Sequence, residues 1–107
     1  MTIDERFDEV VERMIEIGGV TPPGSGRGFG STALRYRGKI FAMIAHQRLV
    51  VKLSEAQVSE LVSAGHGDFF TAGKGRPLGQ WFSLNPGSQL SWEQLAMDAF
   101  HCLDSNG

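Results

Sequence analysis

Two polar dipeptides divide the middle of the chain into three short runs, and this spacing restricts the fold more than any other feature. The runs occupy residues 32–37, 40–45 and 48–53, and Gly38-Lys39 and His46-Gln47 separate them. The first run alternates apolar and polar residues, the second is apolar throughout, and the third is rich in β-branched residues, all of which favour strands. A two-residue connection can join antiparallel strands, whereas parallel strands need a long crossover. We therefore expect three consecutive antiparallel strands, a β-meander.

Helical patterns flank the meander on both sides. Residues 3–17 repeat apolar residues at helical spacing and carry acids on the other face. A short helix begins after Ser54, with Gln57 in the capping-box position, and Gly65 ends it. The last helix follows Ser91 and has one apolar face, formed by Trp92, Leu95, Ala96, Ala99, Phe100 and Leu103.

Glycine-rich segments connect these elements. Residues 20–31 contain two prolines and four alternating glycines, so they cannot continue a helix and are expected to form a loop. Residues 81–84 form an expected fourth strand, which Asn85-Pro86-Gly87 ends. The predicted fold is a single small α+β domain over residues 1–107, in the order helix, three-stranded meander, short helix, further strand and C-terminal helix.

Length and composition indicate a globular chain with one core. The chain has 107 residues, of which 41% are hydrophobic and 21% are charged, close to the averages for globular domains. Its single cysteine, Cys102, cannot form an internal disulfide, and no apolar run approaches the ~20 residues of a membrane span. The acidic start lacks the features of a signal peptide. We expect a cytoplasmic protein that does not engage a membrane.

Basic residues concentrate in the predicted meander. Residues 27–52 carry six bases and no acid, whereas the segments on either side are acidic. Alternation along the first strand predicts that Arg35 and Arg37 share a face opposite Leu34 and Tyr36. With bases from the later glycine loop, the candidate nucleic-acid-binding residues are Arg27, Arg35, Arg37, Lys39, Arg48, Lys52, Lys74 and Arg76. The same residues also suit the solvated face of a half-buried sheet, and a net charge of −2 argues against strong attraction to DNA.

No residue pattern typical of catalysis or of cofactor binding is present. Gly24, Gly26, Gly28 and Gly30 do not have the spacing of a nucleotide-binding loop. The three histidines and Cys102 lack the spacing of metal ligands, and no serine lies in a G-x-S-x-G elbow. We expect no catalytic residue, no metal and no cofactor, and therefore a protein that is not an enzyme.

Three segments of the chain carry a family resemblance. They are Arg-Gly-Phe-Gly-Ser at 27–31, Gly-Lys-Ile-Phe-Ala at 38–42 and Leu-Val-Val-Lys-Leu at 49–53. These segments resemble motifs of the N-terminal domain of the TfoX/Sxy competence-regulator family, which reads Arg-x-Met-Phe-Gly-Gly, a Gly-Lys-x-Phe-Ala hairpin and a strand ending in Lys. The chain lacks the methionine before Phe29 and has Ser31 in place of the second glycine.

The resemblance extends over most of the chain, because Gly65, the expected strand and turn at 81–86 and the last helix also follow the family layout. It implies a stand-alone TfoX N-terminal-like domain with a curved antiparallel sheet, similar to YjbR-like proteins. It also implies regulatory rather than catalytic work, and it supplies no catalytic residues.

Three functional hypotheses follow. The first is a non-enzymatic regulatory or adaptor-type domain that binds another protein through its exposed sheet face and its glycine-rich loops. The alternative is a DNA-binding module that uses the basic sheet face. A second alternative is a small-ligand-binding or enzymatic domain with a pocket near Phe29, Tyr36 and Trp81. Self-association into a homodimer through an exposed strand edge is also left open by the sequence.

Overall fold

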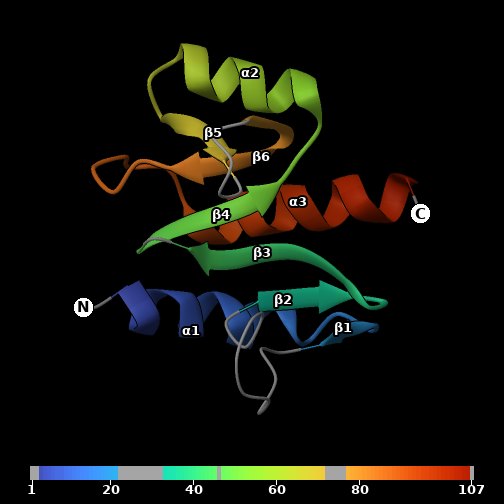
Figure 1. The fold of residues 1–107 in the computed structure, drawn as a ribbon. Coiled ribbons are helices and arrows are strands. Elements are labelled where there is room, and N and C mark those ends of the chain that lie inside the picture. Colours follow the sequence, from blue (N-terminus) through green and yellow to red (C-terminus); the bar gives the residue numbers. More distant parts are fainter. Residues whose placement is uncertain (1–2, 22–32, 46, 72–76, 107) are drawn as a thin grey trace.

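The computed structural model describes residues 3–21, 33–45, 47–71 and 77–106. The described residues form three helices and six strands (Figure 1). Their bounds are α1 Ile3–Met14, β1 Val20–Thr21, β2 Ala33–Tyr36, β3 Lys39–Ala45, β4 Arg48–Lys52, α2 Glu55–Ser63, β5 Gly67–Thr71, β6 Pro77–Leu84 and α3 Trp92–Asn106. The predicted α+β fold class is confirmed, and so are the meander, now β2-β3-β4, and the three helices.

All six strands belong to one antiparallel sheet with the order β1-β2-β3-β4-β6-β5. The strand register divides side chains between two faces, because successive residues of a strand point to opposite sides. One row across the sheet, from β2 to β5, is Leu34, Ala42, Val51, Phe82 and Phe69, and it belongs to the hydrophobic core. The next row lies on the other face and consists of Ala33, Met43, Val50, Ser83 and Asp68.

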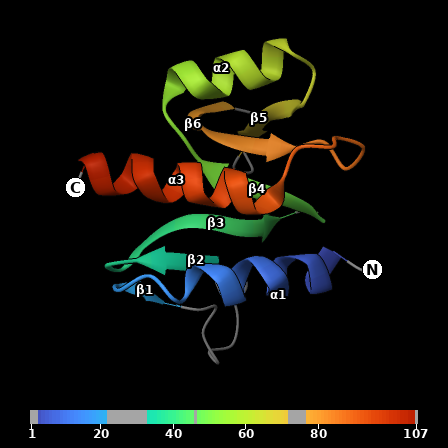
Figure 2. The ribbon, with the colours of Figure 1, turned by 180° about the vertical axis from the view of Figure 1, so that it is seen from behind.

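Helices α1 and α3 lie across the core face of the sheet (Figure 2). Two contacts between the helices fix their mutual position: Arg13 Nε lies 3.2 Å from Glu93 Oε2, and the Arg6 guanidinium lies 4.2 Å from the ring centroid of Trp92. Helix α2 packs instead on β5 and β6, and its buried Val58 joins the same core. Three helices therefore cover the core face, and α2 and α3 lie next to each other on it.

A β-bulge explains why two consecutive residues of β3 are both fully buried. Leu34 pairs with Ala42, but the next residue, Arg35, pairs with Ile40, so Phe41 is one extra residue in β3. In such a bulge two side chains oppose one residue of the partner strand. Phe41 and Ala42 therefore both reach the core, and each has 0% exposed surface.

The first hairpin turn lies one residue earlier than the sequence indicated. Arg37 and Gly38 are the central residues, with φ of 53° and 83°, and Lys39 is already the first residue of β3. Positive φ at both central positions is the geometry of a type I′ turn, which matches the twist of the flanking strands. Arg37 is thus a turn residue and does not continue the strand face that Arg35 occupies.

Other boundaries also differ from expectation. Helix α1 ends at Met14, because Ile17 N bonds to Met14 O in a tighter turn and Gly19 then takes φ of 93°. Strands β1 and β5 were not predicted, and β6 begins at Pro77 rather than at Trp81. None of the helices in the described ranges is long and apolar enough to cross a membrane.

Candidate functional site

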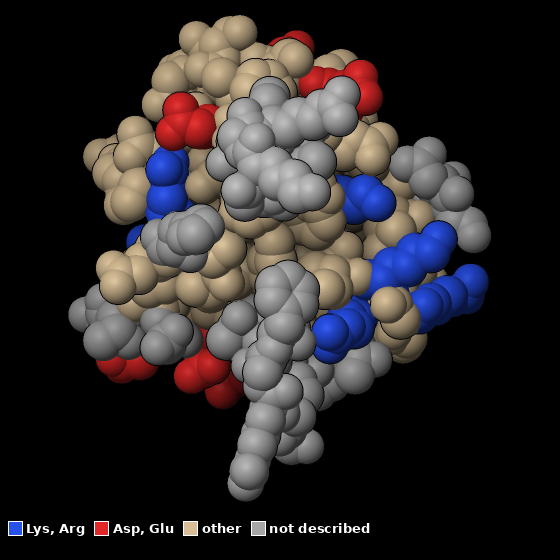
Figure 3. All heavy atoms as spheres, viewed as in Figure 1, with Lys and Arg blue, Asp and Glu red and all other residues tan. Residues whose placement is uncertain are grey.

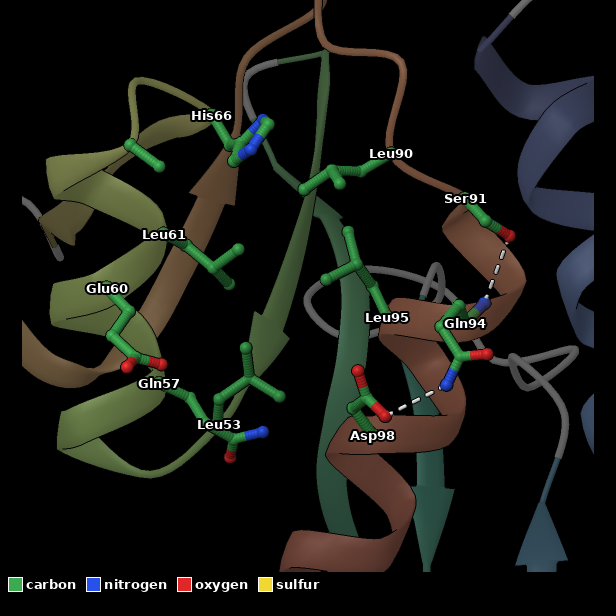
Figure 4. A pocket seen from close by; sticks show the side chains of 11 residues that line it. Leu53, Gln57, Glu60, Leu61, His66, Leu90, Ser91, Gln94, Leu95 and Asp98 are labelled. Atoms are coloured by element: carbon green, nitrogen blue, oxygen red, sulfur yellow. Dashed lines mark hydrogen bonds between the residues drawn. The ribbon is translucent and has the colours of Figure 1, made fainter.

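A groove of about 360 Å³ separates α2 from α3 (Figure 4). Apolar side chains point into it from both helices, from the end of β4 and from the segment before α3. Polar groups stand along its margins. The lining residues are Leu53, Gln57, Glu60, Leu61, Ala64, His66, Leu90, Ser91, Gln94, Leu95 and Asp98.

Both ends of α2 are fixed, which positions its side of the groove. Ser54 Oγ accepts a hydrogen bond from Gln57 N at 3.2 Å, and Ser54 N donates to Gln57 Oε1 at 3.3 Å, which confirms the predicted capping box. At the other end Gly65 has φ of 84°, and His66 N donates to Leu61 O at 3.0 Å. This glycine-dependent cap satisfies the last carbonyls of the helix. Helix α2 therefore presents Leu61 to the groove while Val58 faces the core.

The α3 side begins at the predicted cap. Ser91 Oγ accepts from Gln94 N at 3.2 Å, and Gln94 Nε2 donates to Asp98 Oδ1 at 3.0 Å. Both bonds are visible in Figure 4. Leu95, one helical turn after Ser91, is 5% exposed and forms the floor of the groove together with Leu53. Helix α3 thus contributes an apolar floor and a polar margin.

Hydrogen bonds fix the turn that closes one end of the groove. His66 O accepts from Asn85 N at 2.8 Å, and His66 Nδ1 lies 3.3 Å from Ser88 Oγ. Ser88 Oγ also accepts from Leu90 N at 3.2 Å. These contacts hold the half-exposed side chain of Leu90 at the mouth of the groove. The apolar lining of the groove is therefore held in place by the fold itself and does not need a ligand to form.

The groove lies between two acidic helices. The acids of α2 and α3 are Glu55, Glu60, Glu93, Asp98 and Asp104, and neither helix contains Lys or Arg. Glu93 forms an ion pair with Arg13 of α1. Glu60 and Asp98, from opposite sides of the groove, have no ion-pair partner within the part of the chain that the structure describes.

Four of the predicted nucleic-acid-binding residues lie near one end of the sheet. Arg35, Arg37 and Lys39 belong to the β2–β3 hairpin, and Lys52 ends the neighbouring strand β4. We call these four residues the basic cluster. Figure 3 shows Lys and Arg side chains gathered on the side of the molecule where this hairpin turns. Within the described ranges none of the four forms an ion pair, and the guanidinium of Arg37 lies 5.2 Å from the ring centroid of Tyr36.

Arg48 is not part of this cluster. It lies at the opposite end of β4, where its Nε donates to Leu84 O at 2.9 Å and its Nη2 lies 3.3 Å from Asp68 Oδ2. Nη2 also donates to Ser83 O at 3.4 Å. Arg48 thus binds β6 and β5 of its own sheet. Arg27, Lys74 and Arg76 lie outside the described residues.

Of the three residues of the predicted small-ligand pocket, the two that the structure describes, Tyr36 and Trp81, lie on opposite faces of the sheet. Phe29 lies outside the described residues. Tyr36 belongs to the core face, where its ring meets that of Phe100 at 4.8 Å, whereas Trp81 pairs with Lys52 on the other face. The hydroxyl of Tyr36 donates to Asp104 Oδ1, and this bond, with desolvation, raises the pKa of Tyr36 above its usual 10.0. Tyr36 therefore contacts α3 through both its ring and its hydroxyl.

The described residues contain no group of three or more His, Cys, Asp or Glu that could hold a metal ion. His66 and His101 belong to different parts of the fold, and Cys102 is half-buried on α3. His46 lies outside the described ranges.

Sequence reasoning missed the groove. Two signals were available, since α2 and α3 both lack basic residues and Leu90 precedes the cap of α3 without belonging to its apolar face. Neither signal shows that the two helices are neighbours, because that depends on the order of the strands beneath them.

Comparison with known proteins found no matching family model, no matching curated protein and no matching solved structure.

Proposed function

We propose that this chain is a non-enzymatic binding domain of regulatory or adaptor type, and that it holds a segment of another protein in the groove between α2 and α3. The groove itself carries the proposal. It is open to solvent and lined by leucines from four parts of the fold. Its volume of about 360 Å³ lies within the ~300–1,000 Å³ of ordinary binding pockets.

Burial of apolar side chains supplies the attraction. Leu61 and Leu90 are half-exposed above the buried Leu53 and Leu95. A partner side chain such as leucine would cover all four, and full burial of one such side chain contributes ~1.5–3 kcal/mol. Two anchored side chains would give a weak, reversible complex once the entropy cost of association is subtracted. Such affinity suits regulation better than permanent assembly.

The resemblance of the strand motifs to TfoX/Sxy regulators supports the same reading, since it implies regulatory work. Two of those motifs, at 38–42 and 49–53, form the beginning of β3 and most of β4. These strands lie beneath α3, and Leu53, the last residue of the second motif, follows β4 and lines the groove. The proposed site thus uses the scaffold on which the resemblance rests.

A matched pair of tryptophan variants tests the groove. Ala64 lines it and is exposed, whereas Ser63 is exposed but does not line it. A random peptide library displayed on phage is selected on the wild-type protein and counter-selected on Ala64→Trp. We expect enriched peptides that bind the wild type and Ser63→Trp but not Ala64→Trp. Equal binding to all three proteins, or no enrichment, contradicts the proposal.

A second candidate function is nucleic-acid binding by the basic cluster. The specific observation is that Arg35, Lys39 and Lys52 have no ion pairs within the described residues and lie near one end of the sheet. Cations in such a cluster can contact phosphates and release counterions. The net charge of −2 weakens this candidate.

A further inference from the structure

We infer that the segment held between α2 and α3 is a basic amphipathic peptide, with aliphatic side chains that fill the groove and Lys or Arg side chains that reach Glu60 and Asp98. This inference rests on the proposed function, and it adds the chemical class of the partner. It comes from the charges that surround the groove.

The charged residues of α2 and α3 are all acids. Helix α2 contributes Glu60 to the groove and helix α3 contributes Asp98, so the acids come from both sides (Figure 4). Among the described residues no Lys or Arg lines the groove, and His66 is the one other titratable residue of that lining. A segment that enters between the helices therefore passes two carboxylates and meets no fixed cation from the described part of the chain.

The bases that the structure describes are engaged or placed elsewhere. Arg13 pairs with Glu93 on the side of α3 that faces α1, and Arg48 binds β5 and β6. The basic cluster belongs to the β2–β3 hairpin and the end of β4. None of these residues lines the groove. No described base of this chain therefore neutralises Glu60 or Asp98, and a basic partner would supply those cations.

Hydrogen bonding leaves both carboxylates able to accept from a partner. Glu60 is exposed, and its side chain has no hydrogen bond within the described residues. Asp98 accepts one bond at Oδ1 from Gln94, and a carboxylate can accept about four. A guanidinium or ammonium group can add charge-assisted bonds to each. An acidic segment would instead meet like charges on both sides, which selects against it.

The apolar and charged positions also fit one short segment. Leu61 and Leu95 face each other across the groove. Glu60 is the residue before Leu61 in α2, and Asp98 lies about one turn after Leu95 in α3. Aliphatic residues flanked by bases at short spacing would meet both features at once. Such a pattern is typical of a basic amphipathic segment.

The peptides selected in the library experiment provide the test. We expect the enriched sequences to combine Leu, Ile, Val or Met with an excess of Lys and Arg over Asp and Glu. The best of them is synthesised twice, once as selected and once with its Lys and Arg residues replaced by Gln. Binding of both peptides is measured by fluorescence anisotropy to the wild type, to Glu60→Gln/Asp98→Asn and to the control Glu55→Gln, which lies outside the groove.

We expect the double variant to lose about four- to twenty-fivefold in affinity for the basic peptide, because each of the two exposed charge pairs contributes about two- to fivefold. The Gln peptide should bind the wild type and the double variant equally, and Glu55→Gln should behave as the wild type. Enriched peptides that are neutral or acidic, with binding still lost in Ala64→Trp, overturn this inference but leave the groove as a docking site. If none of the enriched peptides loses binding to Ala64→Trp, the proposed function itself is overturned.

Discussion

The hydroxyl of Tyr36 donates a hydrogen bond to Asp104 Oδ1 over 3.0 Å, and this bond joins the end of β2 to the last turn of α3. The edge of the Tyr36 ring also meets Phe100, one turn earlier on the same helix. The ring also lies against Gly19, where an added Cβ would come within 2.8 Å of Tyr36 Cε1. Tyr36 therefore holds the end of α3 that lies beyond the groove.

Titration of Tyr36 provides the first prediction. The chain contains one tyrosine, so the absorbance change of tyrosinate reports on this residue alone. The hydrogen bond to Asp104 and desolvation both favour the protonated hydroxyl, so we expect a midpoint above 10.0. Unfolded protein in urea should titrate near 10. A folded-state midpoint at or below the unfolded one would contradict the contact with Asp104.

The same shift sets the sign of a pH effect on stability. A pKa raised in the folded state means that the folded chain binds the proton more tightly than the unfolded chain. The contribution of Tyr36 is therefore complete below pH 10 and is lost as the pH rises through the folded-state pKa. Urea denaturation of Tyr36→Phe should show a smaller loss of stability than the wild type over that alkaline range.

Gly67 is predicted to tolerate no side chain. A Cβ at this position would clash with Ser83 O and would lie 2.7 Å from Phe82 Cζ. Overpacking of this kind costs about 1–3 kcal/mol, and we expect Gly67→Ala to lower the free energy of unfolding by at least that amount in urea denaturation. Gly87→Ala is the control, because nothing lies within 4 Å of its added Cβ. Equal stability of the two variants would show that β5 does not pair with β6 as described.

Arg48 and Lys52 are both half-buried at the ends of β4, but within the described residues only Arg48 forms side-chain hydrogen bonds to the sheet. Arg48 bonds to Leu84 O, Ser83 O and Asp68. We expect Arg48→Met to destabilise the fold by about 1–2 kcal/mol, somewhat less than the ~1.5–3 kcal/mol typical of buried charged hydrogen bonds, because the site is partly exposed. Lys52→Met should stay within about 0.5 kcal/mol of the wild type. Thermal unfolding of both variants measures the difference, and a greater loss in Lys52→Met would refute these roles.

The nucleic-acid candidate makes its own prediction. If the basic cluster contacts phosphates, labelled random duplex DNA should bind at low salt, and log affinity should fall linearly with log salt. Changing Arg35, Arg37 and Lys39 to Ala should weaken binding and reduce that slope. Arg48→Met should leave the slope unchanged, since Arg48 is engaged within the sheet. Anisotropy that shows no binding at low salt would remove this candidate.

Local sequence patterns predicted those parts of the fold that depend on near neighbours. The meander followed from two short connections, and the Ser54 and Ser91 caps followed from side chains three residues away. The turn shift at Arg37 has the same local origin, because a type I′ turn needs positive φ at two residues and Gly38 supplies the second.

Features that depend on distant pairing were not predictable in this way. Strand β1 has two residues, and its pairing with β2 decides its existence. The pairing of β5 with β6 and the insertion of β6 beside β4 likewise depend on the whole sheet. That strand order places α2 beside α3, so the groove could be seen only in the assembled fold. The sequence identified the basic residues. It did not show that Arg48 lies apart from the basic cluster, because that depends on the end of the sheet at which each residue lies.

Amide chemical-shift mapping by NMR tests the docking groove most directly. The library-selected basic peptide is titrated into uniformly ¹⁵N-labelled protein, and shift changes are followed for every assigned amide. We expect the largest changes at Leu61, Ala64, His66, Leu90 and Leu95, which line the groove. Changes confined to residues 35–39 and Lys52, with the groove residues unmoved, would contradict the docking site and place the binding surface on the basic cluster.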